Sequence, residues 1–290
     1  MISEPVQILF SENINIFLQN FGTPLVDTLF ITITNTGSHP VYFILASIIF
    51  WCFSKKTGIR AMYVILFSAF LAIFAKNILI MPRPPEHLHK VEVEGFGLPS
   101  AHAQVSAGFW GYLGGHTRNQ KMILIGAAAV ILVSLSRVYL GVHYTGDVMA
   151  GILFGLLIAV ISLKAESWSF NRSMSRIKKY RIAVILPVIL ILIAAVSGLN
   201  LEQLVELWML MVSSGLGYLL EEERIGLEDI KNNTQRLKRA CMGLLLVAFV
   251  YTMFYPVSSF VFFDGIKYAA LGFTSTFVAP WIFIRMERKH

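Results

Sequence analysis

Three polar clusters stand out in a chain that is otherwise largely apolar. They are Lys76 with Arg83-Pro84, then Pro99-Ser100-Ala101-His102, and finally Ser136-Arg137 with His143 and Asp147. Cations gathered at one membrane face repel one another unless an anion joins them, and a charge at membrane depth is costly unless it is paired or lines a cavity. Phosphate has several acceptor oxygens, and the guanidinium fork of arginine can donate two hydrogen bonds to it at once. The cations Lys76, Arg83 and Arg137 therefore predict a phosphate site.

The histidines of these clusters predict phosphoryl transfer at that site. His143 and Asp147 are four residues apart at the expected start of a helix, which places both on one face. A carboxylate bonded to one imidazole nitrogen fixes the tautomer and makes the other nitrogen more basic, as a nucleophilic histidine requires. His102, on another helix, can protonate a leaving oxygen. The Ser100 hydroxyl and the backbone N–H groups around Ala101, at a helix N-terminus, can donate to the anion.

Membrane helices are the elements expected to position these clusters. Of the 290 residues, 56% are hydrophobic and 14% are charged, whereas about 25% of residues are charged in soluble proteins. We therefore predict an all-α, polytopic transmembrane helix bundle of about nine spans, in which Gly151 and Gly155 let helices approach closely. The net charge of +7 fits basic loops beside an anionic membrane surface, so the expected partner is the lipid bilayer and not nucleic acid.

The expected spans follow the apolar runs of the sequence. They cover residues 39–54, 59–80, 101–116, 121–140, 144–164, 182–198, 203–220, 240–257 and 265–284. Before them, residues 5–20 have the mixed polarity of a helix in the membrane interface or of one packed on the bundle, and residues 24–37 are too short for a full span. The chain divides into an N-terminal amphipathic or re-entrant segment, a core with the three clusters, and a basic cytoplasmic loop with the C-terminal spans: 1–38, 39–165 and 166–290.

Lysines and arginines predict the orientation in the membrane. When they are assigned to alternate sides of the expected spans, all but five of the 24 fall on one side, which is therefore cytoplasmic. The five on the opposite side are Lys76, Arg83, Lys90, Arg137 and Lys267. Three of these five belong to the clusters. The predicted site thus lies at the non-cytoplasmic ends of the spans, with the C-terminus in the cytoplasm.

The three clusters also carry a family resemblance. The pattern Lys76-x6-Arg83-Pro84, Pro99-Ser100-Ala101-His102, Ser136-Arg137-x5-His143-x3-Asp147 resembles the three-part signature of the type 2 phosphatidic acid phosphatase superfamily. This superfamily includes lipid phosphate, sphingosine-phosphate and undecaprenyl-diphosphate phosphatases, glucose-6-phosphatases and vanadium haloperoxidases. The resemblance covers residues 25–165 and implies a six-helix phosphatase core. Ala101 stands where the family usually has glycine, and it retains the backbone N–H that the family directs at phosphate.

This resemblance implies a role for each residue. His143 attacks phosphorus to form a phosphohistidine, Asp147 orients it, and His102 protonates the departing alkoxide and then activates water. The groups that hold the phosphoryl oxygens are Lys76, Arg83, Ser100, the Ala101 amide and Arg137. The implied enzyme is a hydrolase that needs no metal and no other cofactor. Glu86-His87-Leu88-His89 has the residue types of a metal chelator, but we expect it to form a solvated rim of the pocket.

The expected substrate is a phosphorylated lipid in the cytoplasmic membrane of a bacterium. Phosphatidic acid, a polyprenyl diphosphate, phosphatidylglycerophosphate and a sphingoid phosphate all fit. Three alternatives stay open: hydrolysis of a sugar phosphate, as in glucose-6-phosphatases, transfer of the phosphoryl group to another lipid, and phosphate binding without catalysis. The intact pair His143 and Asp147, together with His102, argues against the last of these.

Overall fold

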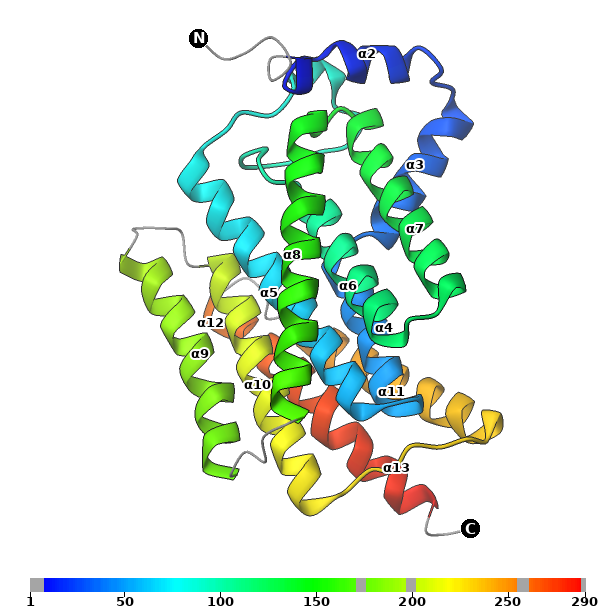
Figure 1. The fold of residues 1–290 in the computed structure, drawn as a ribbon, viewed down its shortest axis with the longest axis vertical. Coiled ribbons are helices and arrows are strands. Elements are labelled where there is room, and N and C mark those ends of the chain that lie inside the picture. Colours follow the sequence, from blue (N-terminus) through cyan, green and yellow to red (C-terminus); the bar gives the residue numbers. More distant parts are fainter. Residues whose placement is uncertain (1–7, 171–175, 197–201, 255–260, 288–290) are drawn as a thin grey trace. The chain divides into compact units, whose positions relative to one another are not determined.

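The computed structural model describes residues 8–170, 176–196, 202–254 and 261–287, and this part of the chain is helical without any strand. The helices, labelled in Figure 1, are α2 (Asn13–Gln19), α3 (Pro24–Thr36), α4 (His39–Cys52), α5 (Lys55–Leu79), η1 (Glu86–Leu88), α6 (Ala101–Thr117), α7 (Gln120–Tyr139), α8 (Thr145–Phe170), α9 (Arg176–Val196), α10 (Glu202–Arg224), α11 (Asn233–Phe254), α12 (Val261–Phe273), the π-helical turn η3 (Thr274–Val278) and α13 (Ala279–Glu287). The all-α prediction is confirmed for these residues. Part of the predicted basic loop, residues 171–175, lies outside them.

Six helical stretches in the described part are long and apolar enough to cross a membrane. They are Lys55–Leu79, Gln120–Tyr139, Thr145–Glu166, Leu204–Arg224, Asn233–Phe254 and Asp264–Glu287. Each corresponds to one of the nine predicted spans. The other three predicted spans fall on α4, which has 14 residues, on α6, which has 17, and on α9, which has 21 and contains Pro187. The chain is therefore an integral membrane protein with six candidate spans among its described residues.

The helices form two compact units. The first contains residues 1–42 and 67–168, and the second contains residues 43–66 and 169–290. The units share α4 and α5, since each of these helices has residues in both. Within the second unit, α10 packs against α9, α12 and η3. All three polar clusters belong to the first unit.

Helix starts in the first unit follow local sequence signals. Thr23 caps α3, since its Oγ1 accepts a hydrogen bond from Val26 N at 3.3 Å, and Pro24 occupies the first helical position. Asn119 caps α7 in the same way and accepts bonds from the backbone N–H groups of Lys121 and Met122. These caps fix where two helices that flank the site begin.

Close packing of α8 on α6 depends on two glycines. A Cβ atom at Gly151 would lie 2.5 Å from Ser100 O, and one at Gly155 would lie 2.2 Å from Gln104 O. Both distances are too short for any other residue, so the predicted role of Gly151 and Gly155 in close helix approach is confirmed. This contact sets the second cluster, at the start of α6, against the third cluster, at the start of α8.

Candidate active site

The first unit gathers all eight residues of the predicted site. Lys76 lies in the last turn of α5, and Arg83 lies in the segment that leads from α5 to α6. Ser100 is the N-cap of α6, with Ala101 and His102 in its first turn. Arg137 lies in the last turn of α7, and Asp147 lies in the first turn of α8. Helix ends therefore position nearly every one of these side chains.

His143 lies in the turn before α8, not on the helix as its spacing from Asp147 suggested, because α8 begins at Thr145. The predicted pair is nevertheless formed: His143 Nδ1 is 3.2 Å from Asp147 Oδ2. The same carboxylate oxygen accepts a bond from Tyr144 N at 3.0 Å. Asp147 therefore orients the imidazole and also satisfies a backbone donor at the start of α8. Both side chains are almost completely buried.

The contacts of His143 assign its tautomer. Arg83 NH1 is 3.2 Å from His143 Nε2, and a guanidinium nitrogen can only donate. Nε2 must therefore be the acceptor, which leaves the proton on Nδ1, where it is donated to Asp147. Burial lowers the pKa of His143 well below its usual range, and the nearby cations Lys76, Arg137 and Arg83 lower it further. The imidazole is thus neutral, with a lone pair on Nε2 that is directed at the cationic side of the site.

Two of the cations bind the segment that precedes the second cluster. Lys76 Nζ donates to Phe96 O at 2.5 Å and to Gly97 O at 2.8 Å. Arg83 donates to the carbonyl oxygens of the two residues before these, from Nε to Gly95 O at 2.8 Å and from NH2 to Glu94 O at 2.9 Å. Carbonyl oxygens accept the same kind of bond as phosphoryl oxygens. The donors are therefore oriented toward one region by the backbone of the chain itself.

The third cation is buried with incomplete pairing. The Arg137 side chain is only 6% exposed, and its NH1 donates to Thr34 Oγ1 at 2.9 Å. Among the described residues, Arg137 Nε, Ser100 Oγ and Asp147 Oδ1 are buried without a hydrogen-bond partner. Buried polar groups are nearly always paired, because an unpaired one is destabilising by about 1–3 kcal/mol. Three of the eleven such atoms in the described part of the chain belong to predicted site residues, which is consistent with a polar ligand as their missing partner.

His102 and Ala101 lie at the opening of α6 and are half-buried. Arg137, Lys76 and Arg83 all interact electrostatically with the His102 imidazole, and His102 interacts in the same way with the His143 imidazole. The two histidines and the three cations therefore lie close enough to influence one another's charge. The Ser100 backbone N–H donates to Asp147 O at 2.9 Å, which ties the start of α6 to the first turn of α8.

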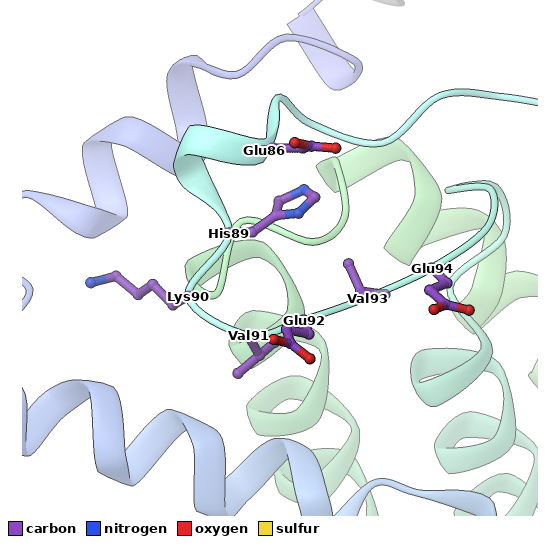
Figure 2. A pocket seen from close by; sticks show the side chains of 7 residues that line it. All are labelled: Glu86, His89, Lys90, Val91, Glu92, Val93 and Glu94. Atoms are coloured by element: carbon purple, nitrogen blue, oxygen red, sulfur yellow. The ribbon is translucent and has the colours of Figure 1, made fainter.

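Residues of the segment that contains Glu86, His87 and His89 line a hollow at the surface. It has a volume of about 510 Å³ and is lined by residues 86 and 89–94. Figure 2 shows Glu86 and His89 on one side of the chain there and Lys90 extending away from them. Within the part of the chain that the structure describes, no three His, Cys, Asp or Glu side chains gather as metal ligands would. The metal-free chemistry itself stays a prediction.

Contacts that the sequence reasoning missed come from the N-terminal helices. Asn15 and Gln19 of α2 donate to backbone carbonyls around the His143 turn, and Thr34 of α3 binds Arg137. The partners are more than 100 residues apart in the chain, so no local pattern could have connected them. Gly141 completes the turn with a φ of +72°, and a Cβ there would lie 2.0 Å from Leu88 O.

Two family models match the chain. A model described as the PAP2 superfamily matches residues 57–171, and one described as PAP2 superfamily phosphatase, transmembrane extension, matches residues 209–290. The first match contains all three polar clusters. The second lies entirely within the second unit.

Known proteins match parts of the chain. An undecaprenyl-diphosphatase of Sulfolobus acidocaldarius is 33% identical over 120 residues, 39% of this chain and 57% of that protein. The glucose-6-phosphatase catalytic subunit 1 of Haplochromis nubilus is 26% identical over 193 residues, 51% of this chain and 54% of that protein. The chain thus spans a little over half the length of these relatives. The crystal structure of a transmembrane PAP2 type phosphatidylglycerolphosphate phosphatase from Bacillus subtilis has a similar fold, with a TM-score of 0.50 and 24% identity, over 57% of this chain and 88% of that one.

Proposed function

Since the chain belongs to the PAP2 superfamily, we propose that it is a membrane phosphatase that hydrolyses a phosphate ester or diphosphate of a lipid. The observation that carries this proposal is the position of His143 between Asp147 and Arg83. Its Nδ1 is 3.2 Å from the carboxylate, and its Nε2 is 3.2 Å from the guanidinium. A neutral imidazole that keeps its lone pair on Nε2 is what nucleophilic attack on phosphorus requires, and Arg83, which now donates to that lone pair, can turn its donor to the phosphate instead.

In the proposed reaction, His143 Nε2 attacks phosphorus. The N–P bond forms as the bond from phosphorus to the leaving oxygen breaks, and His102 gives its proton to that oxygen. Water then attacks the phosphohistidine, His102 takes a proton from it, and the N–P bond breaks to release phosphate. The phosphoryl oxygens are bound by Lys76, Arg83, Ser100, the Ala101 amide and Arg137, the last of which has a buried, unpartnered Nε among the described residues. These donors stabilise the charge of the transition state.

Phosphate binding in this proposal requires an exchange of hydrogen bonds. The Lys76 ammonium and the Arg83 guanidinium donate to carbonyl oxygens of residues 94–97. A phosphoryl group would take some of those donors, and it also supplies the partner that Ser100 Oγ lacks among the described residues. The mechanism uses no metal ion, because the cations and the histidines perform the charge stabilisation and the proton transfers.

The proposed substrate class and membrane orientation rest on several observations. The undecaprenyl-diphosphatase relative acts on a lipid, as its name states. The clusters lie at helix ends, where a headgroup can reach the polar groups while its chains stay in the membrane. We place the site on the non-cytoplasmic side and the C-terminus in the cytoplasm of a bacterial cell, with nine crossings and the segments 1–38, 39–165 and 166–290 as functional divisions. The excess of lysine and arginine on the other side supports this orientation.

A phosphate-release panel on the purified protein tests the proposal. It compares phosphatidic acid, phosphatidylglycerophosphate, undecaprenyl diphosphate, sphingosine phosphate and glucose-6-phosphate, each with and without EDTA. We expect a lipid to be cleaved fastest and EDTA to have no effect. Fastest cleavage of glucose-6-phosphate would replace the lipid proposal with the sugar-phosphate one. If a substrate with a ³²P-labelled phosphate is used, recovery of the ³²P in a second lipid would indicate phosphotransfer.

The nucleophile is tested with two histidine variants in the same panel. His143→Ala is expected to lower phosphate release by about a thousandfold or more on every substrate. His87→Ala is the matched control, because His87 is exposed on η1 and belongs to none of the clusters. It should retain wild-type rates. Comparable activity of the two variants would overturn the assignment of His143.

A further inference from the structure

Helix α2 lies against the turn that carries His143, although it precedes all three clusters and lies outside both family matches. Figure 1 shows it beside the C-terminal end of α7. Asn15 of this helix is fully buried. Its Nδ2 donates to Val138 O at 2.8 Å and to His143 O at 3.0 Å. One side-chain amide thus joins the last turn of α7 to the residue that carries the attacking imidazole.

The orientation of the Asn15 amide follows from its partners. Both are carbonyl oxygens, which can only accept, so the amino group must face them. The other end of the amide, Oδ1, is buried without a partner among the described residues. An aliphatic side chain here would remove the unpartnered oxygen, but it would also take the donor away from the carbonyls of Val138 and His143. The amide at this position therefore serves these two carbonyls.

The bonds of Asn15 restrain the His143 turn from one side, and Arg83 restrains it from the other. Arg83 NH1 donates to Val142 O at 2.8 Å, next to the His143 carbonyl that Asn15 holds. Between Val138, which Asn15 also holds, and Val142 the backbone passes through Gly141, whose φ is +72°. The bonds to the carbonyl oxygens of Val142 and His143 restrict the movement of this turn. Because reacting atoms must be aligned closely for attack, a displacement of about 1 Å can lower a rate about a hundredfold.

We propose that Asn15 is a positioning residue that holds the His143 imidazole in place for attack on phosphorus, an inference that rests on the phosphatase function proposed above. Asn15 acts through the backbone of His143 and touches no reacting atom. Helix α2 also contains its own control. Gln19 Nε2 makes an equivalent pair of bonds, to Leu88 O and Tyr139 O at 2.8 Å each, and neither carbonyl belongs to His143.

The test compares Asn15→Leu with Gln19→Leu in single-turnover reactions at saturating enzyme. The probe is ³²P-labelled phosphatidic acid in detergent micelles, or whichever substrate of the panel the wild-type protein cleaves fastest. Under these conditions the rate constant reports the chemical step and does not depend on the fraction of folded protein. We expect Asn15→Leu to lower this rate constant by about tenfold to a hundredfold. Gln19→Leu should stay within about threefold of wild type, since it disturbs the same helix without freeing His143.

The outcomes separate this inference from the function on which it rests. If the wild-type protein cleaves no substrate of the panel, the phosphatase proposal fails, and the role of Asn15 fails with it. If the wild-type protein is active but the two variants have equal rate constants, only the role of Asn15 is overturned. Should Asn15→Leu not fold, Asn15→Ser keeps one hydroxyl donor and is expected to lose about tenfold. A wild-type rate constant for a folded Asn15→Ser would then overturn the inference.

Discussion

Buried charged side chains are paired more completely in the second compact unit than in the first. In the second unit, Arg239 is completely paired: Nε and NH2 bind the Glu287 carboxylate at 2.8 and 2.9 Å, and NH1 donates to Trp51 O and Glu228 O. Glu221 of the same unit is fully buried and accepts from Lys55 Nζ and from Leu227 N. In the first unit, Arg137 and Asp147 are just as buried, yet each has an atom without a partner among the described residues.

We interpret this difference as one between charges with a structural role and charges that serve the proposed ligand. A completely paired ion inside a protein has no donor or acceptor to spare, so it can only hold its neighbours in place. A buried ion with a free donor or acceptor is unfavourable by itself, and it becomes favourable when a ligand of opposite polarity binds. Such incompletely paired ions lie in the first unit, among the three clusters. Substitution of these charged residues should therefore mainly affect the reaction, and substitution of the paired charges of the second unit should mainly affect folding.

Asp147→Asn should produce the largest effect on the reaction and little on stability. Asparagine keeps an oxygen that can accept from Tyr144 N, but it cannot hold the Nδ1–H tautomer of His143 as a carboxylate does. We expect kcat to fall about a thousandfold or more, in line with the loss of an orienting carboxylate in other enzymes. Initial rates and thermal unfolding in the same detergent measure the two effects. Activity within tenfold of wild type would show that the Asp147 carboxylate is not part of the site.

Arg239→Met should lower stability and leave the rate of the reaction almost unchanged. Removing the guanidinium leaves a carboxylate and two carbonyl oxygens without their donor. Glu287 is 32% exposed and can turn to water, so we expect a loss of about 2–3 kcal/mol, less than for a fully buried pair. That corresponds to a fall in Tm of about 5–10 °C, with kcat within about threefold.

The control for this variant is Lys238→Met, on the neighbouring exposed position of α11. It removes one positive charge without breaking a buried pair, so its Tm should match that of the wild type within about 2 °C. A loss of catalysis in Arg239→Met at unchanged Tm would contradict the division between structural and ligand-serving charge.

The pH dependence of the reaction should show the smallest effect. An ordinary histidine, with a pKa of about 6.5, is about three-quarters protonated at pH 6. Because burial lowers the pKa of His143 well below that range, kcat/KM should change by less than about twofold from pH 7.5 to pH 6 as far as His143 is concerned. An acidic limb with its midpoint at 6.5 or above, together with a titration of the His143 ring at the same pH in NMR spectra, would contradict the neutral, buried imidazole.

The lowered pKa of His143 also makes the stability of the folded protein depend on pH. The unfolded chain binds the His143 proton more readily than the folded one, since the pKa is lowered on folding. The contribution of the buried, neutral imidazole to stability is therefore complete above about pH 6.5 and is lost as the pH falls below that value. Unfolding of the His143→Ala variant should depend less on pH in this acidic range than unfolding of the wild type.

Local patterns predicted the fold class well, and the eight residues that they selected for the site all lie in the first unit. Apolar runs identify helices because a membrane requires long apolar segments, and the six longest candidate spans coincide with predicted ones. Helix spacing failed at His143, which lies in a turn, because the Asp147 carboxylate caps the start of α8 and leaves His143 outside it. The shorter helices α4 and α6 show the limit of hydropathy, since apolar character alone does not set helix length.

By itself, the sequence determined which residues can do chemistry, because residue type and spacing along one chain fix which groups can act as cation, nucleophile or acid. Only the tertiary structure decided which atoms are paired and which are left free. Asn15 and Thr34 reach the His143 turn and Arg137 across more than 100 residues of chain. Arg83 sets the tautomer of His143 in the same way, from another segment. Such contacts depend on how helices pack, and packing joins residues whose separation in the sequence carries no signal.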